Sequence, residues 1–281
     1  MGAVRGLAVD PNATRRQQVC ERAAVARHGR VEHVTNGCAV DRVARGARGF
    51  TRGGEETKSC DGQTVASDPV TSRVLLVRHG QSEWNALGRW QGQADPPLSD
   101  LGRRQARVAA RSIGAVDAIF ASDLQRAIET AAIISGEIGV GPVMIDSELA
   151  ERDAGEWSGL TREEIHERFP GYLPDDRHRA FAPDGSGRPQ RPPGWEPDDV
   201  FLERVRRALA RIHDAVPDGD VLTVTHGGVI YVLEDHLGHR FERMANGAGR
   251  WVEIDGDTLR LGDRVLLAND DGTPVTVPDQ L

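Results

Sequence analysis

The sequence predicts an α/β fold built around a parallel sheet. From Arg73 onward, short apolar runs of strand length alternate with segments of helical pattern, which is typical of such a sheet. Two of the apolar runs end abruptly in a histidine followed by a glycine, at His79 and at His226. Ligands of open α/β sheets bind in the crevice outside the carboxyl ends of the strands. We therefore expect the chemistry of this chain at that edge.

Length and composition describe a globular protein with a substantial core. The 281 residues suffice for one large domain or two small ones, with 38% hydrophobic and 28% charged residues. The chain has neither a run of about eighteen apolar residues nor an apolar export segment near Met1. We therefore expect a cytoplasmic protein without a membrane partner. The net charge of −8 argues against nucleic acid as a partner, and no pattern indicates an oligomeric state.

Composition divides the chain into three parts. Residues 1–72 are rich in Gly, Arg, Ala and Thr and have few large apolar side chains, so they predict a disordered or loosely attached N-terminal extension. Residues 73–268 form the predicted domain. Residues 269–281 are a polar C-terminal tail that we expect to fray.

In the first half of the domain, apolar runs predict three strands, and helices follow the first two. The strands are expected at 74–77, 116–121 and 142–145, and the helices at 99–114 and 123–139. Ser99 is placed to cap the first helix. Ser122 and Gln125 have the spacing of a capping box for the second helix.

The second half continues the alternation around a long loop. Thr161 and Glu164 predict a capping box for a short helix that ends before Pro170. A stretch rich in Pro, Gly, Asp and Arg follows at 171–196, and loops of this length are usually functional lids or disordered. Pro197 marks the first position of the next helix. The remaining elements are that helix to 215, a strand at 220–225, a helix to 237 and a hairpin of 251–254 with 258–261.

The turn Arg78-His79-Gly80 carries the strongest chemical signal. Neutral imidazole is a nucleophile near pH 7, and the planar guanidinium of Arg78 matches phosphate oxygens. Gly80 lets the backbone approach a ligand closely. The same tripeptide occurs at Arg27-His28-Gly29, where no strand-like block precedes it, so we expect that copy to be non-catalytic. Taken alone, the tripeptide is better explained as an ordinary strand end with a solvated arginine and histidine.

Three further residues beside predicted strand ends are candidates for the same site. Arg126 lies in the first turn of a helix, where free N–H groups and the helix dipole favour an anion. Glu151 follows the third strand, and His226 follows the strand at 220–225. Each also has an ordinary structural explanation: a solvated helix arginine, a surface glutamate and a core histidine bonded to backbone.

Taken together and in order, these segments resemble the histidine phosphatase superfamily, with its phosphoglycerate mutase-like fold. The resemblance covers residues 73–268. It implies a three-layer α/β/α sandwich around a mostly parallel sheet. The matching segments are 76–85, 91–99, 122–131, 149–159 and 225–228.

The resemblance also implies roles for the residues. His79 would attack phosphorus and become a phosphohistidine, while Glu151 would protonate the leaving group and then activate water. Arg78, Arg126 and His226 would hold the phosphoryl oxygens. No metal and no cofactor is implied, because arginine and histidine supply the charge. Further residues implied to line the phosphate side of the site are Gly80, Asn85, Gln91, Gly92 and Gly227.

Three functions compete on this basis. The first is a metal-independent phosphatase that acts on a small phosphorylated metabolite. The second is a phosphoglycerate-type mutase, because the insert between Glu151 and His226 includes the basic residues Arg177, Arg179, Arg188 and Arg191. The third is a catalytically silent module that binds phosphorylated ligands. One departure from the phosphatase pattern concerns the substrate-side rim, where 193–197 replaces a Pro-Gly-Gly-Glu-Ser-like segment.

Overall fold

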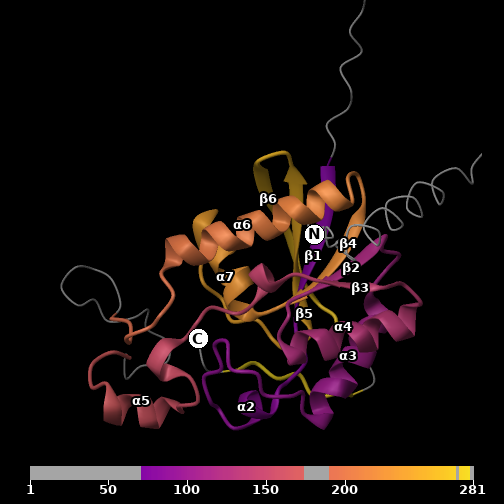
Figure 1. Ribbon diagram of the computed structural model, residues 1–281. Coiled ribbons are helices and arrows are strands. Elements are labelled where there is room, and N and C mark those ends of the chain that lie inside the picture. Colours follow the sequence, from indigo (N-terminus) through magenta and orange to yellow (C-terminus); the bar gives the residue numbers. More distant parts are fainter. Residues whose placement is uncertain (1–70, 174–189, 270–271, 279–281) are drawn as a thin grey trace, which may run out of the picture. The chain divides into compact units, whose positions relative to one another are not determined.

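The computed structural model describes residues 71–173, 190–269 and 272–278 (Figure 1). The predicted N-terminal extension, apart from its last two residues, and the tripeptide Arg27-His28-Gly29 lie outside the described residues. Most of the predicted loop at 171–196 lies outside them as well, including Arg177, Arg179 and Arg188.

A six-stranded sheet forms the centre of the described part, in the order β3-β2-β4-β1-β5-β6. β1 pairs in parallel with β4, β4 with β2, and β2 with β3, while β5 runs antiparallel to both β1 and β6. The sheet is therefore a parallel block that ends in an antiparallel hairpin. The strands are β1 (Thr71–Arg78), β2 (Ala118–Ala121), β3 (Val143–Ile145), β4 (Asp220–Thr225), β5 (Ala248–Asp255) and β6 (Thr258–Leu266).

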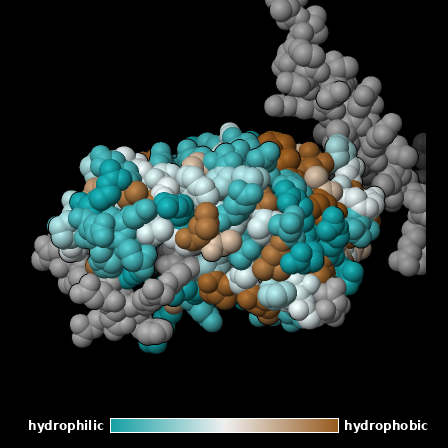
Figure 2. Space-filling view, turned by 90° about the horizontal axis from the view of Figure 1, so that it is seen from below, coloured by the Kyte–Doolittle hydropathy of each residue, from teal (hydrophilic) through white to brown (hydrophobic). Residues whose placement is uncertain are grey.

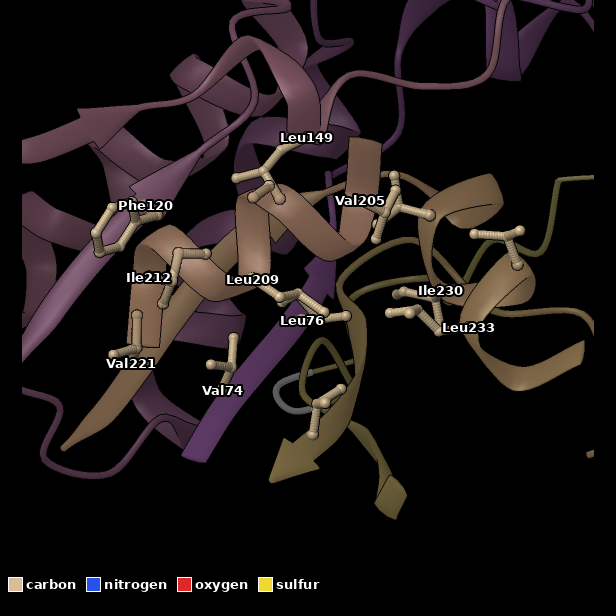
Figure 3. Close-up of a cluster of buried hydrophobic side chains, with 14 of the residues drawn as sticks. Val74, Leu76, Phe120, Leu149, Val205, Leu209, Ile212, Val221, Ile230 and Leu233 are labelled. Atoms are coloured by element: carbon tan, nitrogen blue, oxygen red, sulfur yellow. The ribbon is translucent and has the colours of Figure 1, made fainter. Parts of the chain in front are cut away.

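Helices cover both faces of this sheet, because its central strand is apolar on both sides. Val74 and Leu76 of β1 pack in one core with α6 and α7 (Figures 1 and 3). Leu75 and Val77 alternate with them and pack in a second core with α3 and α4. The predicted three-layer α/β/α sandwich is thus confirmed. The helices are α3 (Asp100–Ser112), α4 (Gln125–Ile138), α6 (Asp198–Ala215) and α7 (Gly227–His236).

Shorter helices lie in the connections. They are α2 (Glu83–Ala86), α5 (Arg162–Arg168) and two 3₁₀ turns, η1 (Ser147–Leu149) and η2 (Gly155–Trp157). The face of the molecule in Figure 2 is mainly hydrophilic, and its hydrophobic residues form separate patches. None of the described helices is both long and apolar enough to cross a membrane.

Two of the predicted helix caps are confirmed and one is wrong. The Ser99 side chain accepts a hydrogen bond from Gly102 N, and Thr161 forms its capping box with Glu164. The box predicted for Ser122 and Gln125 does not form, because α4 begins at Gln125 after Leu124, without a side-chain cap. Ser122 Oγ instead lies 2.8 Å from a ring nitrogen of His226, a tertiary contact that the local spacing could not reveal.

The boundaries of one helix and of the hairpin, and the contacts of the C-terminal tail, differ from the predictions. Pro197 precedes α6 as its N-cap instead of occupying its first helical position. The hairpin strands β5 and β6 extend beyond the predicted 251–254 and 258–261 on the sides away from their turn. The tail was expected to fray, but Thr276 is hydrogen-bonded to Asn246 through its backbone and its side chain.

Candidate active site

The two histidines lie at adjacent strand ends. Arg78 of β1 is paired in register with Thr225 of β4, so that His79 and His226 each follow directly. Their ring centroids are 5.2 Å apart with an interplanar angle of 60°. His79 is 2% exposed and His226 is 0% exposed. Parallel pairing of two buried strands thus brings together residues separated by most of the domain.

His79 is held as a neutral imidazole with one defined tautomer. Its Nδ1 lies 2.6 Å from the carbonyl oxygen of Gly80, which only accepts, so Nδ1 carries the proton and Nε2 has the lone pair. Arg126 Nε donates to Nε2 over 3.3 Å. Burial is the main cause that lowers the pKa of His79 well below its usual value, and the charges of Arg126 and Arg78 lower it further. Nε2 is consequently available as a nucleophile at neutral pH.

The turn that carries His79 is fixed to α4 as well as to the sheet. Gly80 N donates to Thr130 Oγ1 over 3.1 Å, and this hydroxyl donates to the carbonyl of Arg126 over 2.7 Å. Since Thr130 lies one helical turn after Arg126, the same part of α4 positions both the histidine turn and the guanidinium.

Arg126 is a buried cation whose guanidinium group is oriented by hydrogen bonds to backbone carbonyls. Its Nη1 donates to Ala94 O over 2.7 Å and its Nη2 to Gly92 O over 2.9 Å. Burial is the largest influence and lowers its pKa to about 10, which leaves it charged at neutral pH. Gly92 has a φ of +54°, and a Cβ there would lie 2.6 Å from Ala154 N, so this carbonyl position requires glycine.

Arg78 and His226 each contribute a buried nitrogen without a hydrogen-bond partner in the described part of the chain. These atoms are Arg78 Nε and His226 Nδ1. Arg78 Nη1 donates to Met244 O over 2.7 Å, while His226 Nε2 lies 2.8 Å from Ser122 Oγ. Burial, followed by the charge of Arg126, lowers the pKa of His226 well below its usual value. Unpartnered buried donors are costly, and an anion is the group that would satisfy them.

Glu151 lies against the start of α7. Its Oε2 accepts from Gly228 N over 3.2 Å, and its Oε1 accepts from Arg152 N over 2.8 Å. Arg204 holds the backbone on the other side, donating to the carbonyls of Ala150 over 2.7 Å and Glu151 over 2.9 Å. The carboxyl group therefore reaches the helix that begins directly after His226.

One cavity joins several of these residues. It is lined by Arg78, Asn85, Trp90, Gln91, Gly92, Glu151, Arg152, Ala154 and Trp195. His79, Arg126 and His226 are not part of this lining, consistent with their near-complete burial. Gly80 and Gly227 are not part of it either; Gly227 lies beside Arg78, whose Nη1 would be 3.3 Å from an added Cβ.

Aromatic and cationic side chains form the rim of the cavity. Trp195 packs against Trp90 and Trp157, with ring centroids 6.2 and 5.5 Å apart. The guanidinium carbons of Arg191 and Arg152 lie 4.4 and 5.5 Å from the Trp195 ring centroid. The segment at 193–197 that departs from the phosphatase pattern therefore places a tryptophan at the cavity.

Sequence reasoning missed several residues that hold this site together. Ser122 was interpreted as a helix cap, and Arg204 and Thr130 have the ordinary spacing of residues inside amphipathic helices. Asn246 has no local signal at all, yet it is 0% exposed and its Nδ2 donates to the His79 carbonyl over 3.1 Å. These contacts link distant parts of the chain, so a pattern of neighbours along the sequence could not reveal them.

Comparisons with known proteins agree with this geometry. The family model of the histidine phosphatase superfamily (branch 1) matches residues 74–261. A glucosyl-3-phosphoglycerate phosphatase of Mycolicibacterium vanbaalenii is 36% identical over 209 residues, which cover 68% of this chain and 87% of the relative. A metal-independent phosphoserine phosphatase of Arabidopsis thaliana is 30% identical over 205 residues, covering 72% and 82% of the two chains.

A solved structure agrees as well. The mycobacterial glucosyl-3-phosphoglycerate phosphatase in complex with VO3 superimposes with a TM-score of 0.55 and 30% identity, covering 68% of this chain and 96% of that one. The family match spans the two strand-end histidines, both arginines and Glu151. The chain therefore belongs to the histidine phosphatase superfamily, and it is a phosphatase of that superfamily.

Proposed function

We propose that this protein hydrolyses the phosphate monoester of a small metabolite through a phosphohistidine at His79 Nε2. The observation that carries the proposal is the pair of contacts on the His79 ring. Nδ1 is bound to the Gly80 carbonyl at 2.6 Å, and Nε2 faces a guanidinium N–H of Arg126 at 3.3 Å. The ring is therefore neutral, oriented and next to a group that binds anions.

In the first step, the Nε2 lone pair attacks phosphorus and the bond to the ester oxygen breaks. Glu151, in its protonated form, gives its proton to the departing oxygen, so that a neutral alcohol leaves. Arg78, Arg126 and His226 hold the three phosphoryl oxygens while charge shifts among them. The unpartnered Arg78 Nε and His226 Nδ1 are the donors suited to these oxygens.

In the second step, the Glu151 carboxylate takes a proton from water, and the resulting hydroxide attacks the phosphohistidine. The N–P bond breaks, inorganic phosphate leaves, and both His79 and Glu151 return to their starting forms. Because the Arg78 and Arg126 guanidinium groups balance the phosphoryl charge and the neutral His226 ring donates a hydrogen bond, the proposed reaction needs no metal ion and no cofactor. Relatives named as phosphatases, one of them described as metal-independent, support this direction.

The test is turnover of p-nitrophenyl phosphate and a panel of phosphorylated metabolites, with and without EDTA. His79→Ala should abolish turnover and the acid-labile phosphoenzyme trapped from labelled substrate. His239→Ala provides the control, because His239 is an exposed histidine outside the site. Retained turnover in His79→Ala, or inhibition by EDTA, would contradict the proposal. Isomerisation of a phosphorylated sugar acid faster than phosphate release, dependent on a bisphosphate, would identify a mutase instead.

A further inference from the structure

The segment 272–278 lies beyond residues 74–261, which the family model matches, yet it contacts Asn246 and Gln105, two residues that hold the strand end around His79. Thr276 O accepts from Asn246 N over 2.9 Å, and Thr276 Oγ1 donates to Asn246 Oδ1 over 2.9 Å. Val275 and Val277 on either side are 44% and 52% exposed. The segment is therefore held at this point mainly by the hydrogen bonds of Thr276 and not by burial of its valine neighbours.

The Thr276 hydroxyl also connects to Gln105, a fully buried residue of α3. Gln105 Oε1 accepts from the backbone N–H of Gln81 over 2.8 Å, so the other end of this amide must be the NH2 group. This Nε2 donates to Thr276 Oγ1 over 2.9 Å and to Pro274 O over 3.0 Å. Since the hydroxyl oxygen accepts from Gln105, its single proton is directed to Asn246.

That proton sets the orientation of the Asn246 amide. With Oδ1 facing Thr276, the Nδ2 group faces the His79 carbonyl at 3.1 Å and Asn85 Oδ1 at 3.2 Å. Asn85 Oδ1 thus accepts from Asn246, so the Asn85 amide presents its N–H donors at the opposite end. A phosphate requires such donors. A flipped Asn246 would place an oxygen against two oxygens.

The loop around Asn246 contacts the turn at two more points. Gly247 N donates to Arg78 O over 3.0 Å, and Met244 O accepts from Arg78 Nη1 over 2.7 Å. One loop therefore holds the backbone of Arg78 and of His79 together with the Arg78 guanidinium, and Thr276 holds that loop.

We propose that Thr276 is a positioning residue for the reaction, because its hydroxyl fixes the direction of the hydrogen bonds from Gln81 through Gln105 and Asn246 to His79 and Asn85. The inference rests on the proposed function for its catalytic consequence. It assigns the C-terminal segment a part in the active site that residues 73–268 alone would lack.

The experiment compares four variants in the full chain. Thr276→Val keeps the shape and removes the hydroxyl, Thr276→Ser keeps the hydroxyl, and Val277→Ala is the matched control in the same segment. For each, kcat and KM on p-nitrophenyl phosphate, the thermal unfolding temperature and the affinity for orthovanadate are measured. Asn246→Asp, which replaces the donor facing His79 by an oxygen, tests the other end of the chain of hydrogen bonds.

Thr276→Val should lower kcat by about tenfold to a hundredfold, with a much smaller change in KM, because small displacements at a reacting group have effects of this size. Thr276→Ser should stay within about threefold of the parent, and Val277→Ala should match it. Asn246→Asp should lose kcat as Thr276→Val does, including when Thr276→Val fails to fold. An unchanged kcat in Thr276→Val, or equal losses in Thr276→Val and Thr276→Ser, would overturn the inference.

The vanadate measurement separates this inference from the proposed function. If the parent protein binds vanadate without hydrolysing any ester, the proposed function fails. The inference then requires that Thr276→Val weaken vanadate binding at least about tenfold, and an unchanged affinity overturns it. A parent protein with neither turnover nor vanadate binding overturns both.

Discussion

Ser122 Oγ lies 2.8 Å from Nε2 of His226, and both residues are fully buried. The same oxygen accepts from Leu124 N over 3.2 Å. Within the described residues, the hydroxyl proton has His226 Nε2 as its acceptor, so Nδ1 of His226 carries the ring proton. Ser122 thereby turns His226 into a donor at the nitrogen that has no partner in the described part.

Ser122→Ala should therefore lower kcat by about tenfold or more, since the orientation of a hydrogen-bond donor to the phosphoryl group is lost. KM should change less than kcat. Steady-state kinetics on p-nitrophenyl phosphate check this, with Ser112→Ala as the control, whose hydroxyl donates to Leu267 O away from the histidines. Equal kinetics in the two variants would show that Ser122 does not direct His226.

Gly228→Ala should remove the function of Glu151 without removing the carboxyl group. A Cβ at Gly228 would lie 2.0 Å from Glu151 Oε1, so the side chain must move away. We expect kcat to fall by about a hundredfold, the typical contribution of a positioned acid or base.

The control for this variant is Gly136→Ala, in the last turn of α4, where an added Cβ meets nothing within 4 Å. It should keep full activity and gain about 0.5–1 kcal/mol in free energy of unfolding, because alanine is favoured over glycine in helices. Chemical denaturation and kinetics of both variants provide the comparison. A fully active Gly228→Ala would contradict the position assigned to Glu151.

The pH dependence of stability should reflect the two buried histidines. Burial lowers the pKa of His79 and His226 in the folded state, so between the lowered values and about 6.5 the unfolded chain binds more protons than the folded one. Stability should therefore fall as the pH drops below about 6.5, with a slope of up to about 1.4 kcal/mol per pH unit for each histidine.

Urea unfolding from about pH 5 to 8 measures this slope. His79→Gln and His226→Gln should each make it shallower, while His239→Gln, at an exposed position, should leave it unchanged. A parent protein whose stability does not change below about pH 6.5 would contradict the neutral, buried state of both rings.

Arg204→Lys should lower both stability and activity, because lysine cannot make the contacts of Arg204. Arg204 donates to three carbonyls, of Glu148, Ala150 and Glu151, and pairs with Glu196 at 2.7 Å. An ammonium group cannot reproduce this planar set of bonds. We expect about 2–4 kcal/mol lower free energy of unfolding, together with lower kcat because the Glu151 backbone is released.

Arg206→Lys, two residues along the same helix, should leave both quantities near the parent values, because the Arg206 guanidinium contacts the exposed His236 ring at 3.5 Å on the exterior. Thermal unfolding and kinetics of the two variants decide between them. Equal effects would mean that Arg204 acts only as a helix surface charge.

The fold was largely predictable because its signals are local. The apolar run ending at Arg78 is a strand buried on both faces, and the caps at Ser99 and Thr161 depend only on residues three positions away. The arrangement of His79 beside His226 followed from parallel strands ending at one edge. Ser122 shows the limit of this reasoning, since its spacing to Gln125 suggested a cap while its tertiary partner lies 104 positions away.

The contacts that hold the active-site residues in place were not predictable, because they join residues far apart in the sequence. Thr276, Asn246 and Gln105 are ordinary polar residues in their local sequence, and only the folded chain brings their amides and hydroxyl into one series of hydrogen bonds. The polar composition of 269–281 indicated exposure and therefore concealed this contact. Trp195 was likewise hidden in a segment notable only for its departure from a family pattern.

If His79 reacts as proposed, the Arg126 N–H that donates to its Nε2 would also determine which electrophiles the ring attacks. A neutral alkylating or acylating reagent meets a lone pair that is already shared with a guanidinium, on a ring that is 2% exposed. An anionic phosphoryl group offers oxygens to the same N–H and thereby draws it away from the nitrogen. In the proposed reaction, the residue that attracts the substrate would thus also shield the His79 nitrogen from neutral electrophiles.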